Sequence, residues 1–273
     1  MGEPTWDSAR LAAECGEIWR LRLGKPFPYA FASIAMPATR EDGSEVVLKV
    51  QRPHRESDQE ADALAAWDGQ GAVRLLAHDR PRSALLIERC VPGEALAAQD
   101  PEVALREMIR LLPRLLIGVG VGAFRPLAEE AEWWASQLPG QWEGAGRPYE
   151  KRMLDATLDI LRSLPPTQGE QVLVNQDLHP GNVLAAQREP WLVIDPKPLA
   201  GEREFALAPI VRATELGHSK RQVLRRLDRL SSELGLDRDR ARRWCVAQTV
   251  AWAIEDTVIE THLDVARWLL ESC

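Results

Sequence analysis

The stretch that decides the fold is residues 174–184, which read VNQDLHPGNVL. It places Asp177 and Asn182 five residues apart on a Pro-Gly loop between two apolar runs that favour strands. A third apolar run, residues 191–194, ends directly before Asp195. A carboxylate that orients a hydroxyl, with oxygen ligands for Mg²⁺ nearby, is what phosphoryl transfer requires. The alternative is that Asp177 and Asn182 are turn formers, since both residue types bond their own backbone in turns.

A lysine in an apolar strand adds a second signal. Residues 46–50 read VVLKV, and an unpaired ammonium group is expensive to bury, so Lys49 needs an anion. Glu60, eleven residues later in an amphipathic helical pattern, is the candidate partner. Together they would hold the α and β phosphates of ATP. The alternative is an edge-strand lysine whose head stays in water.

The periodicity of the chain predicts two lobes. A helix from Trp6 to about Leu23 precedes strands at 32–37 and 45–50, which are joined by an Asp-Gly hairpin turn. The N-terminal lobe, 1–90, is completed by a helix and two further strands, and the C-terminal lobe, 91–273, is mostly helical and carries the 171–194 loop and hairpin. The remaining predicted segments are a helix at 56–68, strands at 72–77 and 84–88, and helices at 101–121, 127–137 and 149–163.

Composition excludes several classes of protein. The 273 residues are 45% hydrophobic, which is enough for a packed core, and the net charge of −7 offers no basic field for nucleic acid. We expect no membrane span, because the longest apolar run falls short of the roughly 20 residues a helix needs. Four scattered cysteines and an N-terminus without a signal peptide predict a cytoplasmic protein with reduced thiols.

Taken together, these segments resemble the aminoglycoside phosphotransferases, and most closely the streptomycin 6-phosphotransferase branch. The Asp-Leu-His-Pro-Gly-Asn string with its downstream Ile-Asp-Pro is specific, whereas the lysine and glutamate alone are weak signals. The resemblance covers residues 30–210. The strings that carry it are VLKVQ (47–51), WDGQGAVRLL (67–76), LIERC (86–90), DLHPGN (177–182) and VIDPKP (193–198).

The resemblance implies an α+β, bilobal protein-kinase-like fold with ATP and Mg²⁺ as cosubstrates. Lys49 would bind the ATP phosphates and Glu60 would orient Lys49. Asp177 is similar to the catalytic base, and Asn182 and Asp195 are similar to the metal ligands.

Two further segments are assigned by the same resemblance. Residues 88–91, with Glu88 and Cys90, look like the hinge whose backbone bonds adenine. His179 matches a loop histidine that organises hydrogen bonds rather than acting as an acid or base.

Three departures from the family pattern concern the loops. Asn175 and Gln176 precede Asp177, where the family has His-Gly, and this adds bulk where glycine lets the backbone fold tightly. The nucleotide-covering turn, 28–33, has no glycine, so fewer backbone N–H groups can approach the phosphates closely. Ser33 would substitute for these contacts. Ala206 replaces an aspartate that supports the loop in relatives. None of these removes a metal ligand or the base, so we expect an active enzyme.

A cationic acceptor requires carboxylates around Asp177. Four-residue spacing places Trp252, Asp256 and Glu260 on one helix face, which suits a guanidinium or ammonium sugar. The alternative is a solvated face with Trp252 in the core. Glu202 and Glu204 are alternative cation contacts. The arginine-rich segment 220–243 is interleaved with acids, which indicates a salt-bridged helix pair rather than a nucleic-acid surface.

The sequence therefore predicts a monomeric phosphotransferase that phosphorylates an aminocyclitol antibiotic such as streptomycin and confers resistance. The second-ranked acceptor is another hydroxylated metabolite, such as a sugar, a choline-like compound or hydroxyurea. A nucleotide-binding pseudokinase is the alternative outside the enzymes. A protein kinase ranks third, because no Asp-Phe-Gly or Ala-Pro-Glu string frames an activation segment. The choice between ATP and GTP is not encoded in these patterns.

Overall fold

The computed structural model describes residues 7–28 and 33–272. The chain divides into two compact units: Met1–Glu94 with Leu184–Lys197, and Ala95–Val183 with Pro198–Cys273. Within the described ranges, no helix has both the length and the apolar character needed to cross a bilayer.

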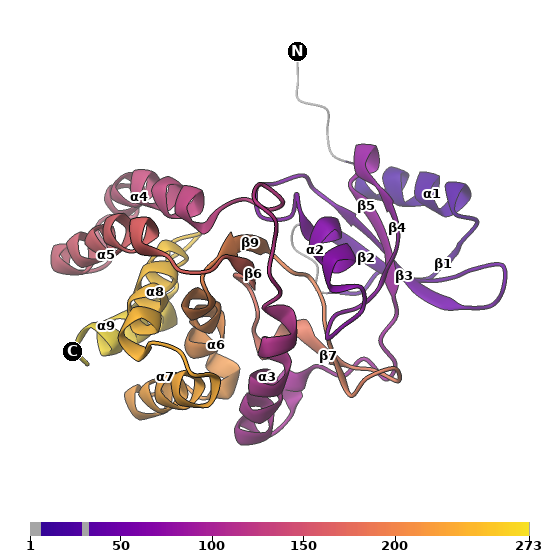
Figure 1. The fold of residues 1–273 in the computed structure, drawn as a ribbon. Coiled ribbons are helices and arrows are strands. Elements are labelled where there is room, and N and C mark those ends of the chain that lie inside the picture. The colour runs from indigo at the N-terminus through magenta and orange to yellow at the C-terminus, as the bar shows by residue number, and fades with distance from the viewer. Residues whose placement is uncertain (1–6, 29–32, 273) are drawn as a thin grey trace, which may run out of the picture. The chain divides into compact units, whose positions relative to one another are not determined.

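A five-stranded antiparallel sheet forms the centre of the first unit (Figure 1). The strand order is β1-β2-β3-β5-β4, so β3 lies inside the sheet with a partner on each side. The strands are β1 (Arg22–Leu23), β2 (Ser33–Thr39), β3 (Glu45–Gln51), β4 (Leu75–Asp79) and β5 (Ala84–Glu88). The predicted hairpin is confirmed, because β2 and β3 pair in register from Ser33 and Gln51 to Thr39 and Glu45.

Two helices accompany this sheet, α1 (Ser8–Ile18) and α2 (Glu60–Trp67). Cys15 of α1 packs into a core with Leu48 and Leu86 of the sheet. The sequence predicted that α1 would continue to Leu23, but the helix stops at Ile18 because Arg20 adopts a left-handed φ of 51° and Arg22–Leu23 pairs with β2 as β1.

The segment 184–197 belongs to the first unit, not to the helical one. It contains most of a small hairpin, β7 (Val183–Ala185) with β8 (Trp191–Val193). Arg188 at the turn donates to the carbonyls of Gly69 (2.6 Å) and Ala72 (2.9 Å), which attaches the hairpin to the unit. The predicted division at residue 90 therefore differs from the structure, which divides the chain after Glu94 and returns 184–197 to the first unit.

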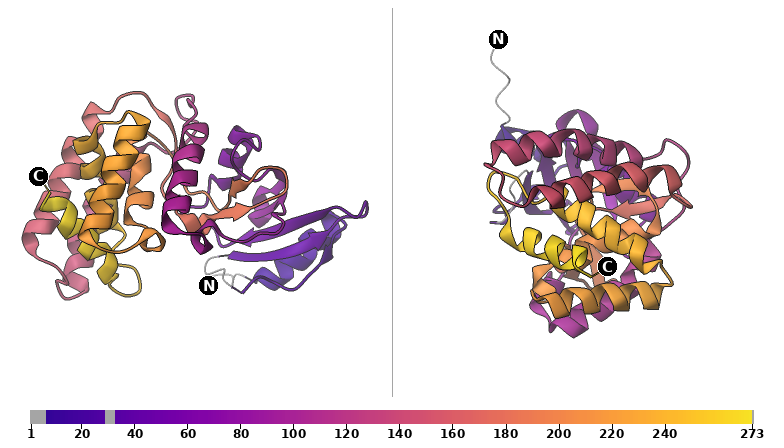
Figure 2. Two further views of the ribbon diagram at one scale, coloured as in Figure 1. Left: turned by 90° about the horizontal axis from the view of Figure 1, so that it is seen from below. Right: turned by 90° about the vertical axis from the view of Figure 1, so that its left-hand side faces the viewer.

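Helices dominate the second unit (Figure 2). Its helices are α3 (Pro101–Leu115), α4 (Leu127–Gly144), α5 (Lys151–Ser163), α6 (Ala208–Arg212), α7 (Lys220–Leu234), α8 (Arg238–Ala251) and α9 (Glu260–Leu270). The central helix is α8, which packs against α5, α6, α7 and α9. The aromatic core joins Phe205 to Trp244 edge-on, with centroids 5.5 Å apart, and to Trp134 at 6.2 Å.

A two-stranded antiparallel sheet, β6 (Val172–Asn175) with β9 (Pro198–Gly201), leads into and away from the predicted loop. The short 3₁₀ helix η4 (Pro180–Asn182) ends that loop. Two further 3₁₀ helices, η5 (Arg203–Leu207) and η6 (Thr214–Leu216), flank α6.

The arginine-rich segment forms α7 and α8, which confirms the predicted helix pair. Salt bridges join Arg238 to Asp228 and Arg229 to Glu233, both at 2.6 Å. Most of the pair's arginines reach the surface, but Arg226 and Arg242 are buried.

Gly201 tests the packing of β9 against α4. A Cβ added at this position would lie 2.8 Å from Leu127 Cβ, so Gly201→Ala should reduce the free energy of unfolding by about 1–3 kcal/mol through overpacking. Gly140→Ala, in open space on the same helix, should instead leave stability unchanged or raise it by up to about 1 kcal/mol. Urea unfolding of both variants measures this; equal effects would contradict the packing.

Candidate active site

Lys49 contacts two of the other predicted site residues of the first unit, Glu60 and Asp195. Its Nζ lies 2.8 and 2.7 Å from the two carboxylate oxygens of Glu60 and 2.5 Å from Asp195 Oδ1. Lys49 is only 6% exposed and Glu60 only 1%. The predicted pairing is confirmed, and the edge-strand alternative is wrong because β3 is an interior strand.

The charges of Lys49 and its two acidic partners act on one another, and burial raises the pKa of Glu60 to about 7 although Lys49 opposes this. Burial by itself would lower the pKa of Lys49, but the carboxylates of Glu60 and Asp195 outweigh it and hold the pKa above its usual value. Lys49 in turn lowers the pKa of Asp195, although burial opposes this. Gln51 also donates a hydrogen bond to Glu60, which fixes the carboxylate from a second side. The ammonium group and the Asp195 carboxylate thus stay ionised at neutral pH.

Each unit presents an oxygen donor of the kind that Mg²⁺ prefers. The Asp195 side chain remains 47% exposed despite its bond to Lys49, so carboxylate surface is left for a ligand. Asn182 uses its amide NH₂ to donate to the carbonyl of Asp177 (3.1 Å), which leaves its amide oxygen as an acceptor. Across residues 7–28 and 33–272 no three His, Cys, Asp or Glu side chains form a metal-binding group. Proteins hold Mg²⁺ through one or two carboxylates together with phosphates.

The predicted hinge follows β5. The Glu88 carboxylate binds Arg188 through two 2.8 Å hydrogen bonds and accepts from the Arg74 amide at 3.0 Å. Its side chain is therefore committed to the fold, and only the hinge backbone stays a candidate for adenine. Burial raises the pKa of the Cys90 thiol to about 12, so this thiol is neutral.

The nucleotide-covering turn is only partly described. Ser33 opens β2 opposite Gln51. Residues 29–32 of the predicted turn lie outside the described residues.

In the second unit, Asp177 is held by the residues around it. The Asn175 side chain accepts from the Asp177 amide at 3.0 Å, and Gln248 of α8 donates to the Gln176 carbonyl at 2.6 Å. Asn175 and Gln176 are buried, so the bulk that departs from the family pattern is accommodated inside the unit. Gln248 thus supports the loop from α8, a contact that no spacing in the sequence indicates.

His179 organises the same loop. Its Nδ1 lies 2.8 Å from Glu215 Oε1 of η6. A Cβ at Gly181 would lie 2.6 Å from His179 Cε1, so only glycine fits beside the ring. Burial opposes ionisation of Glu215, but the hydrogen bond from His179 prevails and lowers the pKa of Glu215. Glu215 is a support residue that no sequence spacing had indicated.

Arg212 is the most consequential residue that sequence reasoning missed. It ends α6, is buried, and its NH2 atom lies 3.5 Å from Asp177 Oδ1. Its guanidinium lies over the Trp252 ring, 4.3 Å from the centroid. A buried arginine after the apolar residues Pro209, Ile210 and Val211 was the available signal. A cation therefore already stands beside the predicted base.

The prediction that 252–260 forms one helix face is wrong. α8 ends at Ala251, and a turn closed by the Ile254–Val258 bridge separates it from α9, which begins at Glu260. β-Branched residues from Ile254 to Ile259 disfavour a continuous helix. Trp252, Asp256 and Glu260 therefore share no helix face, and Asp256 and Glu260 are exposed.

Glu202 is also unsuited to binding a cationic acceptor. It is 3% exposed, and its carboxylate binds Arg240 Nε at 2.7 Å and accepts from Trp244 Nε1. It is an internal counter-ion for α8, so the expected acceptor contact is contradicted. Glu204 is partly exposed and accepts weakly from the Asp237 amide at 3.4 Å.

Comparison with known proteins gives these two groups of residues a context. Residues 19–257 match the model of a family described as aminoglycoside/hydroxyurea antibiotic resistance kinase. The chain belongs to this family. It is thus a phosphotransferase that acts on hydroxyl groups of small molecules, and the predicted family is confirmed.

Two relatives are similar to this kinase in sequence, and one solved structure is similar to it in fold. It is 40% identical to a hydroxyurea phosphotransferase of Kitasatospora aureofaciens (94% of this chain, 77% of the relative). It is 36% identical to a streptomycin 6-kinase of Streptomyces griseus (90% and 83%). A thermostable mutant of aminoglycoside phosphotransferase APH(4)-Ia, in ternary complex with AMP-PNP and hygromycin B, matches with a TM-score of 0.63 at 15% identity (96% and 95%). This likeness confirms the protein-kinase-like fold.

His262 gives this kinase a pH-dependent stability. Burial and then Arg212 lower the pKa of His262 to about 4, against the pull of its 2.8 Å contact with the Trp252 carbonyl. Between about pH 6.5 and 4 only the unfolded chain takes up this proton, so the free energy of unfolding should fall as the pH drops, by roughly 3 kcal/mol at most. Above pH 6.5 His262 contributes no pH dependence.

Urea unfolding at a series of pH values measures the effect. His262→Gln keeps a donor for the Trp252 carbonyl and should show a shallower loss of stability over this window. An unchanged pH profile in the variant would assign the loss to other groups.

Proposed function

We propose that this kinase transfers the γ-phosphoryl group of ATP, with Mg²⁺, to a hydroxyl of a small molecule such as an aminocyclitol antibiotic of the streptomycin type. The observation that carries this proposal is the buried Lys49, which contacts the carboxylates of Glu60 and Asp195. A lysine held by two carboxylates inside a sheet is costly to build, and a nucleotide phosphate is the ligand that uses its charge.

In the first unit, Glu60 would orient Lys49 and leave its ammonium group to bind the phosphates. Asp195 would give Mg²⁺ a carboxylate oxygen, and Asn182, which belongs to the second unit, is proposed to give its amide oxygen. When bound, Mg²⁺ offsets negative charge on the phosphate oxygens. The hinge backbone after Glu88 would bind adenine.

In the second unit, Asp177 would align the acceptor hydroxyl and accept its proton late in the reaction. The acceptor oxygen forms a bond to the γ-phosphorus while the bond to the β-γ bridging oxygen breaks, and ADP leaves. Arg212, Asn182 and Asn175 hold Asp177 in place through the contacts described above. Positioning is the principal contribution that proteins make to this chemistry.

A second acceptor class is favoured by Arg212. The sequence predicted carboxylates for a polycationic acceptor, yet Glu202 is internally paired and the 252–260 helix face does not exist. A guanidinium stands 3.5 Å from Asp177 instead. Such a charge disfavours a polycation near the base and tolerates a small neutral acceptor such as hydroxyurea.

Asp177→Asn tests the assignment of the base. The amide cannot accept the proton, so turnover should fall by roughly 10²–10⁴-fold. The dissociation constant for ATP should stay within about twofold, because Asp177 does not bind the nucleotide in this proposal. Coupled ADP release and nucleotide titration measure the two quantities. Asp159→Asn, at an exposed position on α5, is the matched acid-to-amide control and should keep normal turnover. Near-normal turnover of Asp177→Asn would remove the base assignment.

Arg212→Met tests the choice of acceptor. It removes the charge and keeps an unbranched side chain, so the ratio of kcat/KM for streptomycin to kcat/KM for hydroxyurea should rise by about tenfold. Arg203→Met, on the exposed start of η5, makes the same change in net charge and should leave the ratio unchanged. If both variants shift the ratio equally, Arg212 does not select the acceptor.

A further inference from the structure

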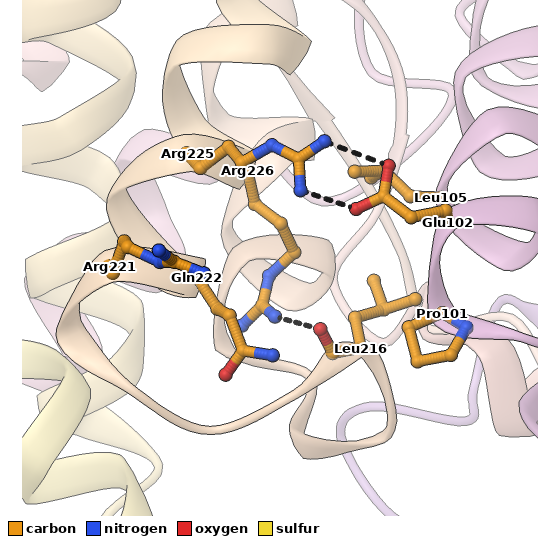
Figure 3. Close-up of a pocket in the computed structure, with 8 residues that line it drawn as sticks. All are labelled: Pro101, Glu102, Leu105, Leu216, Arg221, Gln222, Arg225 and Arg226. Atoms are coloured by element: carbon orange, nitrogen blue, oxygen red, sulfur yellow. Dashed lines mark hydrogen bonds and ion pairs between the residues drawn. The ribbon is translucent and has the colours of Figure 1, made fainter.

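A concave site lies in the helical unit, between the start of α3 and the η6–α7 segment (Figure 3). Its cavity has a volume of about 410 Å³. The walls combine apolar and charged side chains, and none of them belongs to the residues assigned to catalysis above. The lining residues are Pro101, Glu102, Leu105, Leu216, Arg221, Gln222, Arg225 and Arg226.

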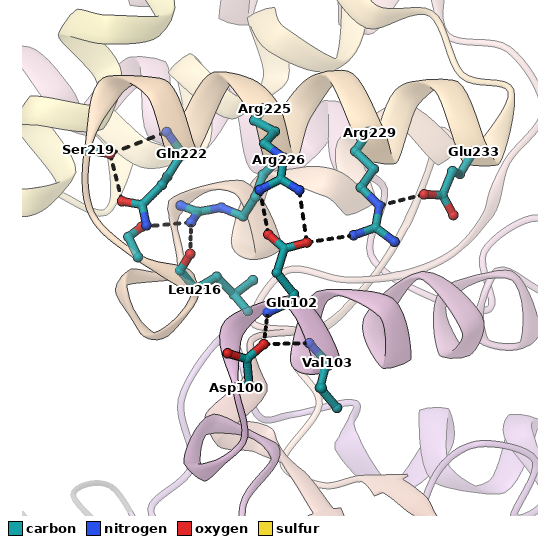
Figure 4. A network of polar contacts seen from close by, with 11 residues as sticks. Asp100, Glu102, Val103, Leu216, Ser219, Gln222, Arg225, Arg226, Arg229 and Glu233 are labelled. Atoms are coloured by element: carbon teal, nitrogen blue, oxygen red, sulfur yellow. Dashed lines mark hydrogen bonds and ion pairs between the residues drawn. The ribbon is translucent and has the colours of Figure 1, made fainter.

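The lining is electropositive. Three guanidinium groups face one carboxylate, which leaves two net positive charges. Glu102 is moreover shared, since it accepts from Arg225 at 2.7 and 3.1 Å and from Arg229 at 3.2 Å (Figure 4). Arg221 is exposed and has no ion pair within the described residues. The cavity therefore offers more positive charge than its own carboxylate can neutralise.

Arg226 provides the decisive observation. It is 2% exposed, and its NH1 and NH2 atoms donate only to carbonyls: those of Leu216 and Gly217, and that of Val211, all at 2.7 Å. Its Nε has no hydrogen-bond partner within the described chain. Carbonyl oxygens satisfy N–H groups but do not neutralise a charge.

The other buried basic side chains of the described chain are arranged differently. Lys49 binds Glu60, Arg212 contacts Asp177, and Arg242 binds Asp239 at 2.7 Å. Arg226 alone among these four has no carboxylate in contact. A buried charge without a counter-ion is costly, so its environment favours an anion from outside the chain. Burial lowers the pKa of Arg226 to about 10, and only Glu215 opposes this shift. The lowered pKa agrees with the absence of a contacting carboxylate.

We propose that this cavity binds a phosphate dianion, either free inorganic phosphate or the phosphate group of a small phosphomonoester. Two net positive charges match a dianion, and guanidinium groups bind tetrahedral oxyanions through paired N–H donors. Arg221 and Arg225 would contact the phosphate directly, with Arg226 supplying charge from beneath. Leu105, Leu216 and Pro101 would contact the small organic part of a monoester.

The site also touches the support of the Asp177 loop. The backbone that Arg226 binds, from Val211 to Gly217, carries Arg212 and Glu215, which contact Asp177 and His179. Phosphate binding and the loop thus share one structural element. The binding proposal itself does not depend on the proposed function.

Isothermal titration calorimetry of the full chain with inorganic phosphate, methyl phosphate and acetate at constant ionic strength tests the proposal. Arg221→Ala should weaken phosphate binding by about fivefold, and Glu102→Gln should strengthen it by about threefold because it removes the competing negative charge. Arg106→Ala, an exposed arginine on α3 outside the cavity, is the matched control and should bind like the wild type. Phosphate that binds elsewhere on the chain contributes equally to the titrations of the wild type and the three variants.

Methyl phosphate that binds as well as inorganic phosphate would identify a phosphomonoester ligand, and binding of inorganic phosphate alone would identify the free ion. Acetate should bind more weakly than both. Absent phosphate binding, equal losses in Arg221→Ala and Arg106→Ala, or weaker binding by Glu102→Gln would each overturn the proposal. Failure of phosphate transfer to any acceptor would leave this test unaffected.

Discussion

The burial of one ammonium group in the middle of a sheet is the constraint on which the first unit depends. Lys49 is on β3, the interior strand, where only 6% of the residue is exposed to water. Isolated, it would lose its charge or destabilise the strand. The chain solves this with Glu60, from the helix that follows, and with Asp195, which is 146 residues away in sequence. The second partner requires that residues 184–197 return to this unit, and Arg188 attaches them there.

The helical unit holds its carboxylate by a different arrangement. Asp177 is surrounded by residues from several elements: Asn175 from β6, Arg212 from α6 and Gln248 from α8, while His179 is tied to η6. These contacts restrict the rotamer of Asp177 and the path of its loop, which is what a residue that orients a hydroxyl needs. Buried arginines recur in this unit and bind backbone carbonyls as well as acids, which fixes the short segments between helices.

How much the sequence could predict follows from the range of each interaction. The loop string, the strand lysine and the hairpin depend on neighbouring residues, and each led to a correct structural expectation. The turn between α8 and α9 was missed because four-residue spacing of Trp252, Asp256 and Glu260 imitates a helix, while the breaking signal is a dispersed set of β-branched residues. Glu202 was misjudged because its partners, Arg240 and Trp244, lie about 40 residues away and meet it only in the folded chain. Glu215 and Gln248 support the loop through long-range contacts that no local pattern indicates, and the only local signal for Arg212 is the apolar run before it.

The central claim is that a phosphoryl group moves from ATP to a small acceptor under the control of the two groups of residues. Mass spectrometry of streptomycin and hydroxyurea, each incubated with the kinase, ATP and Mg²⁺, tests it most directly. The account predicts that at least one acceptor gains a single phosphoryl group, and that chelation of Mg²⁺ abolishes the gain. ATP binding with no phosphorylated product from either acceptor or from a wider panel of sugars and choline-like alcohols would contradict it and indicate a binding protein.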